Sequence, residues 1–328
     1  MKVVVFSDRQ QHFNLGSLRF FGVSYHHVLV DILMRIPQVT EILFFDTVPA
    51  HQKQMGAVKV RFIPYTSPGV DIRAIREYLD DQPFILITGN TIPDLKFENI
   101  IHPHTARSAI VTAFITQQTQ AGYFFQSDEI HIARDIGFER TDWQFHCSQV
   151  FMVSPEAIAY VSESCYLWYE SLLPTLIKNN RRVLLIDHID PVVILNTPDD
   201  LYTYYFEALN KSTNTLPGLK MPFGYLGEGT ELAETTTILD GFVGKRCKLA
   251  DEVIVRHSIL TEDIFIDEHS RISDTIILAH THIGKNCELQ FSLIGEHVRI
   301  DDNTRLPKYA IIPAHSHITA QGGVLRER

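Results

Sequence analysis

Aliphatic residues recur every 17 positions along the C-terminal third of the chain. Two further aliphatic columns follow the first at offsets of six and eleven residues, running from Ile238 to Leu306 and from Val243 to Ile311. The first column consists of Leu232, Leu249, Ile266, Ile283 and Ile300. Neither the period of a helix nor the alternation of a flat strand gives three such columns, so the pattern predicts a chain that coils.

Each coil of 17 residues presents three short strands, and its inward aliphatic side chains stack on those of the next coil. Small or turn-forming residues follow every member of the first column, as a corner between two flat faces requires: Ala233, Ala250, Asp267, Gly284 and Asp301. This pattern resembles the hexapeptide-repeat, left-handed parallel β-helix, which we expect over residues 221–328. An antiparallel β-sandwich is the alternative, but its strands alternate and keep no fixed long period.

The preceding residues, 1–210, alternate apolar strand patterns with helical spacing. Strands are predicted at 2–6, 41–45, 84–88, 149–153 and 182–187, and helices at 26–36, 71–79, 171–180 and 199–210. This alternation predicts an α/β domain with a mostly parallel sheet and helices on its faces. Residues 211–220 are polar, contain Pro217 and Gly218, and are interpreted as the linker between the two domains.

Composition narrows the choice of partners and compartment. The chain has 328 residues and a formal net charge of −10, without a run of five or more basic residues, so nucleic acid and anionic membranes are not expected as partners. No window holds eighteen consecutive apolar residues, and a membrane span is not expected. The cysteines are scattered without a C-x-x-C pair, which favours a reducing cytoplasm and gives no zinc site: Cys147, Cys165, Cys247 and Cys287.

Four segments of the N-terminal region carry motifs of a known family. They read ILITGNTIPDLKFENII (85–101), CSQVFMVSPEAIAYV (147–161), LLPTLIKNNRRVLLI (172–186) and VVILNTPDDLYTYYFEAL (192–209). Together with the repeat, the chain resembles the sugar-1-phosphate nucleotidyltransferases, whose members with such a tail include mannose-1-phosphate guanylyltransferases and glucose-1-phosphate adenylyltransferases. The resemblance implies a nucleotidyltransferase-like, Rossmann-like domain followed by the β-helix.

The resemblance also implies a chemistry that this sequence is poorly equipped to perform. Such enzymes join a nucleoside triphosphate to a sugar 1-phosphate, release pyrophosphate, and hold a divalent cation with carboxylates. The family's two metal-binding aspartates map onto Asn90, which is uncharged, and Ile194, which has no ligand atom. Its glycine-rich phosphate loop maps onto Ser7–Phe21, where Gly16 is the one glycine and lysine is absent.

The sugar-contacting positions have diverged as well. The family's asparagine maps onto Cys147 and its following glycine onto Gln149. We therefore interpret the chain as a catalytically degenerate relative, a regulatory, ligand-sensing or assembly subunit of sugar-nucleotide metabolism without a predicted cofactor or metal. The positions expected to line a retained pocket for a nucleotide sugar or sugar phosphate are Ser7, Gly89, Asn90, Cys147 and Gln149.

A rearranged active site is a first alternative. Asp8, Arg9, Asp94 and Asp128 are the candidate catalytic residues, with Asp94 replacing the charge that Asn90 lacks. Mg²⁺ would be required only in this case. The simpler interpretation of Asp94 is a solvated turn residue after a proline.

A second alternative is acyl transfer by the β-helix, with a histidine as general base. His280 and His297 are 17 residues apart, so they should lie one above the other on one edge. The simpler interpretation is an exposed polar ladder on the outside of the coils. A β-helix of this kind also predicts self-association into a homo-oligomer, or a hetero-oligomer with an active paralogue.

One histidine pair lies outside these schemes. His102 and His104 flank a proline near Arg107, in the segment IIHPHTARSAI. A phosphate contact is conceivable for such a trio, but the proline favours an ordinary loop.

Overall fold

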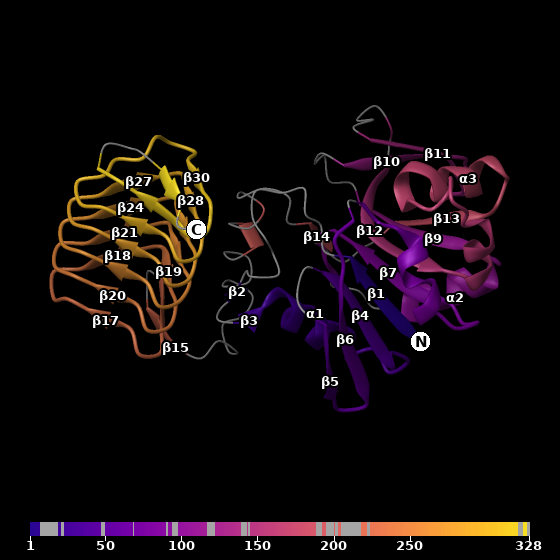
Figure 1. Cartoon of the computed structure of the whole chain (residues 1–328), viewed down its shortest axis with the longest axis horizontal. Helices are drawn as coiled ribbons and strands as arrows, with labels where there is room; N and C mark the ends of the chain where they lie inside the picture. The colour runs from indigo at the N-terminus through magenta and orange to yellow at the C-terminus, as the bar shows by residue number, and fades with distance from the viewer. Residues whose placement is uncertain are drawn as a thin grey trace. The chain divides into compact units, whose positions relative to one another are not determined.

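The structure is a computed structural model that describes residues 1–6, 19–20, 23–46, 50–67, 69–89, 91–93, 98–116, 122–138, 143, 145–187, 192–194, 200, 203–204, 218–221, 224–320 and 324–326. The chain divides into two compact units (Figure 1). The first contains residues 1–10 and 28–195, and the second contains residues 11–27 and 196–328. The predicted linker, 211–220, lies outside the described residues except at its end.

A ten-stranded sheet organises the first unit, and all five predicted strands are confirmed within it. Its main order is β11-β10-β12-β7-β1-β4-β6-β5, while β9 pairs with β12 and β13. The strands are β1 (Lys2–Phe6), β4 (Glu41–Asp46), β5 (His51–Met55), β6 (Val58–Pro64), β7 (Phe84–Thr88), β9 (Val111–Thr116), β10 (Tyr123–Ser127), β11 (Ala133–Phe138), β12 (Phe145–Val153) and β13 (Val183–Asp187).

The sheet is mixed, and the expectation of a mostly parallel sheet is wrong. Strand β1 runs parallel to β4 and β7, and the pairs β4–β6 and β9–β13 are also parallel. Strand β12, however, runs antiparallel to β7, β9 and β10, and two hairpins add the antiparallel pairs β5–β6 and β10–β11. A buried strand is apolar whichever way it runs, so its hydrophobic pattern does not encode its direction.

Short helices accompany the sheet: α1 (Tyr25–Leu33), η1 (Ile72–Tyr78), α2 (Glu98–Ala106), η2 (Pro155–Tyr160), η3 (Trp168–Leu172) and α3 (Leu173–Lys178). The helices predicted at 26–36, 71–79 and 171–180 are confirmed as α1, as the 3₁₀ turn η1, and as the π turn η3 with α3. The fourth, 199–210, lies mostly outside the described residues. Among the helices that the structure describes, none is long and apolar enough to cross a membrane.

Helix α2 corrects one interpretation. His102 and His104 lie in this helix and not in a loop, although Pro103 stands between them. The Arg107 amide donates to the Pro103 carbonyl at 3.0 Å, so the helical turn continues past the proline. His104 is 2% exposed, which makes it a core residue.

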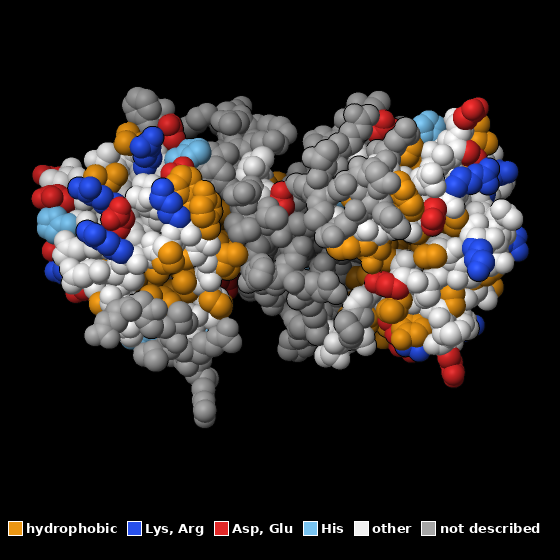
Figure 2. All heavy atoms as spheres, turned by 90° about the horizontal axis from the view of Figure 1, so that it is seen from above, with side chains coloured by type: hydrophobic (Ala, Val, Ile, Leu, Met, Phe, Trp, Pro, Cys, Tyr) orange, Lys and Arg blue, Asp and Glu red, His pale blue; other side chains and the backbone are white. Residues whose placement is uncertain are grey.

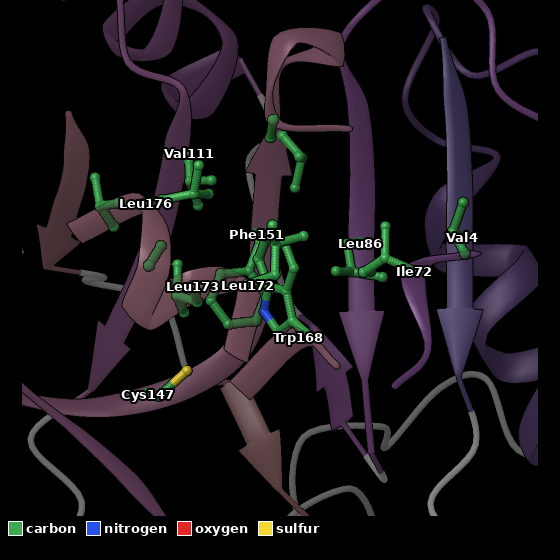
Figure 3. Packing of buried hydrophobic residues seen from close by; sticks show 14 of the residues in the cluster. Val4, Ile72, Leu86, Val111, Cys147, Phe151, Trp168, Leu172, Leu173 and Leu176 are labelled. Carbon is green, nitrogen blue, oxygen red and sulfur yellow. The ribbon is translucent and has the colours of Figure 1, made fainter. Parts of the chain in front are cut away.

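The core of the first unit packs between the sheet and the segment that follows η2. Trp168 is fully buried, and its ring meets Phe151 of β12 edge to face at 5.1 Å between centroids. Figure 3 shows these two rings beside Leu172, with Cys147 at the lower edge of the same cluster. The core therefore reaches the end of β12 where the predicted site begins.

The second unit contains a parallel β-helix, as predicted (Figure 1, orange to yellow). One sheet runs β15 (Gly218–Met221), β16 (Gly224–Gly227), β19 (Gly241–Val243), β22 (Ile259–Leu260), β25 (Ile276–Ile277), β28 (Leu293–Ile294) and β30 (Ile311–Ile312). The next runs β17 (Glu231–Leu232), β20 (Lys248–Leu249), β23 (Phe265–Ile266), β26 (His282–Ile283), β29 (Arg299–Ile300), β31 (Ser316–Ile318) and β32 (Val324–Arg326). The third runs β18 (Thr237–Leu239), β21 (Ile254–Arg256), β24 (Arg271–Ser273) and β27 (Glu288–Gln290).

Successive coils pair in parallel at the predicted spacing of 17 residues, for example Ile266 with Ile283. The inward aliphatic columns form one buried cluster along the coils. Each coil of a solenoid contacts only its neighbours. The apolar surface that adjacent coils bury between them is therefore the main source of its stability. The left-handed winding implied by the resemblance stays a prediction.

The last coil departs from the period by one residue. Leu293 pairs with Ile311 and Ile294 with Ile312, which is a spacing of 18. Ile312 is therefore the inward residue at 8% exposure, whereas Ile311, the predicted inward residue, is 37% exposed. The prediction for Ile311 is wrong, because one extra residue enters after Arg305, which still bridges Glu288 at the regular spacing.

Polar atoms are satisfied from coil to coil at the corners. The Ser270 hydroxyl donates to the Gly284 carbonyl at 2.7 Å and accepts from the Cys287 amide at 2.9 Å. Cys287 occupies the same corner position one coil later, and burial raises the pKa of its thiol. It acts there as a small buried residue, which explains a cysteine without a partner cysteine or a metal.

Two small pairings complete the secondary structure. Strands β2 (Arg19–Phe20) and β3 (Val23–Ser24) form a hairpin. Strands β8 (Thr91–Pro93) and β14 (Val192–Ile194) form an antiparallel pair beside the end of β7.

Candidate functional site

The candidate site lies where β7 ends. Gly89 follows that strand with φ of +72°, a conformation that favours glycine, and its amide donates to the Phe6 carbonyl at 2.9 Å. Thr91 begins β8 and pairs with Ile194 of β14. The structure thus brings the backbone of Ile194 beside Thr91, the residue that follows Asn90 in the sequence.

Gln149 covers the glycine. Its φ is +65°, and it lies in an irregularity of β12 where the register against β9 shifts between Cys147 and Phe151. Its side-chain Oε1 accepts a hydrogen bond from the Thr91 hydroxyl at 3.1 Å. A Cβ placed on Gly89 would lie 2.1 Å from the same Oε1.

Three of the five predicted ligand-binding positions therefore come together: Gly89, Cys147 and Gln149. The Gln149 amide lies 3.4 Å from the Cys147 sulfur, with the geometry of a weak hydrogen bond. Ser7 and Asn90 lie outside the described residues, as does the side chain of Ile194.

A tyrosine completes the site and was missed from the sequence. The Tyr169 hydroxyl lies 2.5 Å from the Thr88 hydroxyl at the end of β7. The Tyr169 ring stacks on Tyr123 at 4.1 Å between centroids, and the Tyr123 hydroxyl donates to Glu170 at 3.1 Å. No sequence pattern signals this contact, because Thr88 and Tyr169 are 81 residues apart.

Among the described residues, the groups that contact the end of β7 are neutral. Burial raises the pKa of the Cys147 thiol to about 12 and the pKa of Tyr169 well above its usual value. Neither group ionises near neutral pH, so Cys147 is not an activated nucleophile. The remaining contacts are the hydroxyls of Thr88 and Thr91 and the carboxamide of Gln149, whereas hard divalent cations favour carboxylates.

The residues of the rearranged site divide into two groups. Asp8, Arg9 and Asp94 lie outside the described residues. Asp128 stabilises the β10–β11 hairpin: its carboxylate accepts from the Ile132 amide at 2.8 Å and from Arg134 at 2.6 Å. These hydrogen bonds lower the pKa of Asp128. Because they hold the hairpin together, the role of Asp128 is structural.

The histidines of the acyl-transfer alternative form a stacked column at one corner of the β-helix. His280 and His297 stack at 4.7 Å between centroids, as their spacing predicts, and His297 and His315 stack at 4.9 Å. His315 was missed because it follows His297 by 18 residues, across the extra residue of the last coil. All three rings are exposed.

This column is anchored by a salt bridge. Arg246 donates to Asp263 at 2.7 Å, and Nδ1 of His280 lies 3.6 Å from the same carboxylate. Parallel rings one coil apart cannot converge on one metal ion at about 2 Å. Within the described ranges, no group of three or more histidine, cysteine or acidic side chains has the arrangement of a metal site.

The stacking leads to a prediction for His297. Its pKa is lowered by partial burial and by its neighbours His280 and His315. We expect its ring to titrate below an ordinary histidine in NMR spectra, and His280→Ala to raise its midpoint by removing a neighbouring positive charge. His257→Ala, at another corner, is the control. An unchanged midpoint in His280→Ala would contradict the prediction.

Comparisons with known proteins give matches to parts of the chain. Residues 225–322 match the family model of the GMPPB C-terminal domain. A glucose-1-phosphate adenylyltransferase of Bacillus cytotoxicus is 30% identical over 71 residues, which are 22% of this chain and 18% of that protein. Those of Bacillus thuringiensis and Bacillus cereus are 25% identical over 73 residues, or 22% of this chain and 19% of theirs.

These matches support the resemblance to sugar-1-phosphate nucleotidyltransferases. The family model covers the β-helix and leaves the strand-end site outside its range. The chain aligns with less than a fifth of the length of these curated relatives.

Proposed function

We propose that this chain is a catalytically degenerate relative of the sugar-1-phosphate nucleotidyltransferases. The proposal starts from its C-terminal domain, which is of the kind that such proteins carry. The chain serves as a regulatory or assembly subunit of sugar-nucleotide metabolism. One observation carries the proposal: at the end of β7, where the family chemistry requires a bound cation, the described side chains that contact one another are neutral.

The missing charge matters because nucleotidyl transfer builds negative charge on phosphate oxygens. A divalent cation held by carboxylates stabilises that charge, and a positioned lysine or arginine assists. The second position mapped to a metal ligand is Ile194, whose aliphatic side chain has no ligand atom and whose backbone pairs with Thr91. The first is Asn90, which contributes at most a carbonyl oxygen.

The β-helix supplies the surface for assembly. Tyr309 and Phe291, in neighbouring coils, are 75% and 40% exposed, and their rings lie 5.6 Å apart. Exposed aromatic side chains of this kind are enriched at protein interfaces. Figure 2 shows acidic, basic and histidine side chains interspersed on the face of the β-helix in view, at the left. Self-association and association with an active paralogue both fit this surface.

A pyrophosphate-release assay tests the proposal. The purified protein is incubated with Mg²⁺, ATP or GTP, and glucose 1-phosphate or mannose 1-phosphate. We expect no release above the protein-free background, while an active glucose-1-phosphate adenylyltransferase in the same assay gives a strong signal. Magnesium-dependent release by this protein with any pair would contradict the proposal.

The stacked histidines favour acyl transfer as a second candidate. His297, with its lowered pKa, is mainly neutral at pH 7 and able to accept a proton. Turnover of acetyl-CoA with sugar acceptors, abolished by His280→Ala or His297→Ala, would support this candidate. Turnover that persists in both variants would exclude the column as its site.

A further inference from the structure

The backbone of Gln149 is unusual for its place in a strand. A φ of +65° is uncommon for a residue other than glycine, and here it falls inside β12, between Cys147 and Val150. Such a conformation is sterically unfavourable for a residue with a Cβ and persists only where surrounding contacts impose it. The contacts of the Gln149 side chain therefore indicate why this backbone conformation is present.

These contacts direct the side chain onto Gly89. Its Oε1 accepts from Thr91, which is fully buried, and occupies the space that any side chain at position 89 would need. The Gln149 carbonyl also lies 3.4 Å from the Thr88 hydroxyl, which donates to it. Glycine at 89 and glutamine at 149 are thus fitted to each other across β7 and β12.

We propose that Gln149 is a built-in occupant of the strand-end site. Its carboxamide fills the space over Gly89 and takes the hydrogen bond of Thr91 that a ligand's polar group would otherwise receive. The site is closed in the resting protein, and Gln149 is the residue that determines whether it accepts a ligand.

The groups behind the carboxamide define what the opened site would take. The Thr88 and Thr91 hydroxyls and the Cys147 thiol are neutral, as is Tyr169. They suit the hydroxyl groups of a hexosyl moiety and offer no cation to a phosphate. The inference therefore rests on the proposed function for its ligand class and deepens it by assigning the hexosyl part of a sugar phosphate to this space.

Gln149→Gly is the direct test. Glycine adopts the observed φ without strain, and the backbone contacts to Cys147 and Thr88 involve main-chain atoms that the variant keeps. We expect glucose 1-phosphate or mannose 1-phosphate to bind this variant at least about tenfold more tightly than the wild type, by isothermal titration calorimetry without Mg²⁺. Gln149→Ala is the second variant, should the glycine fail to fold.

Two controls separate the occupant from backbone effects. Asn180→Gly relieves a positive φ of 54° at the end of α3, far along the chain, and should leave sugar binding unchanged. Gln149→Asn keeps a carboxamide on a shorter side chain and should bind more weakly than the glycine variant.

The outcomes are distinct from those of the proposed function. Equal affinity in wild type and Gln149→Gly, or no binding by either folded variant, would overturn the role of Gln149. Pyrophosphate release by the wild type would overturn the proposed function alone, because it reports catalysis and not the closure of this space.

Discussion

Replacing Ile312 by alanine is expected to lower the free energy of unfolding of the β-helix by about 2 to 4 kcal/mol. The side chain is 8% exposed and belongs to the buried aliphatic cluster, so its removal leaves a cavity that the neighbouring coils cannot fully close. Ile311→Ala should cost less than about 1 kcal/mol, because that side chain is 37% exposed. The two variants delete the same atoms from neighbouring positions.

Far-ultraviolet circular dichroism during urea denaturation measures this difference. Both tryptophans, Trp143 and Trp168, lie in the first unit, so tryptophan fluorescence serves as an internal control that neither variant should change. A larger loss for Ile311→Ala would mean that the last coil keeps the 17-residue register. The one-residue shift would then be wrong.

Acid is expected to destabilise the first unit through His104. Its ring is 2% exposed, with Nδ1 2.8 Å from the Thr112 hydroxyl and Nε2 2.9 Å from the Ser154 hydroxyl. Burial lowers its pKa to about 4, against an opposing effect of Glu156. The unfolded chain therefore binds a proton first as the pH falls, and stability is lost between about pH 6.5 and pH 4, by about 3 kcal/mol in total.

His104→Asn tests this assignment, since asparagine keeps one hydrogen-bonding group but cannot titrate. Denaturation followed by tryptophan fluorescence at pH 7 and pH 4.5 should show a smaller loss of stability on acidification in this variant than in the wild type. His102→Asn, an exposed position in the same helix, should keep the wild-type loss. Equal pH dependence in all three proteins would contradict the role of His104.

The β-helix was the most predictable part of the molecule. Its long period identifies inward positions without reference to the rest of the chain, and residues such as Ile277 and Ile294 are fully buried as predicted. The failure at Ile311 has a local cause. An inserted residue shifts every later side chain by one position, and positions 311 and 312 are both isoleucine, so the inward position is apolar in either register.

The first unit was predictable in its elements but not in its directions. The five apolar strands are confirmed, yet the antiparallel course of β12 follows from long-range connections that no local pattern contains. The prediction of a loop at His102 and His104 was wrong. Proline disfavours a helix interior, but the packing that buries His104 overrides this local preference in α2.

The candidate site was only partly predictable. The resemblance predicts Gly89, Cys147 and Gln149 as ligand-binding residues, and the structure brings the three close together, while their binding of a ligand stays a prediction. It gave no sign that the Gln149 side chain fills the pocket itself, because that depends on a positive φ inside a strand. Tyr169 reaches the site from the segment after η2, a contact that sequence spacing does not reveal.

The most direct test of the account is a single-turnover measurement with the protein in excess over radiolabelled nucleoside triphosphate, together with saturating sugar 1-phosphate and Mg²⁺. With the protein in excess, neither slow product release nor a low turnover number can hide the formation of product. We predict that no labelled nucleotide sugar forms above background, because the side chains that the structure describes at the end of β7 are neutral. Formation of labelled product that disappears when Mg²⁺ is chelated would contradict it and show that a working metal site exists.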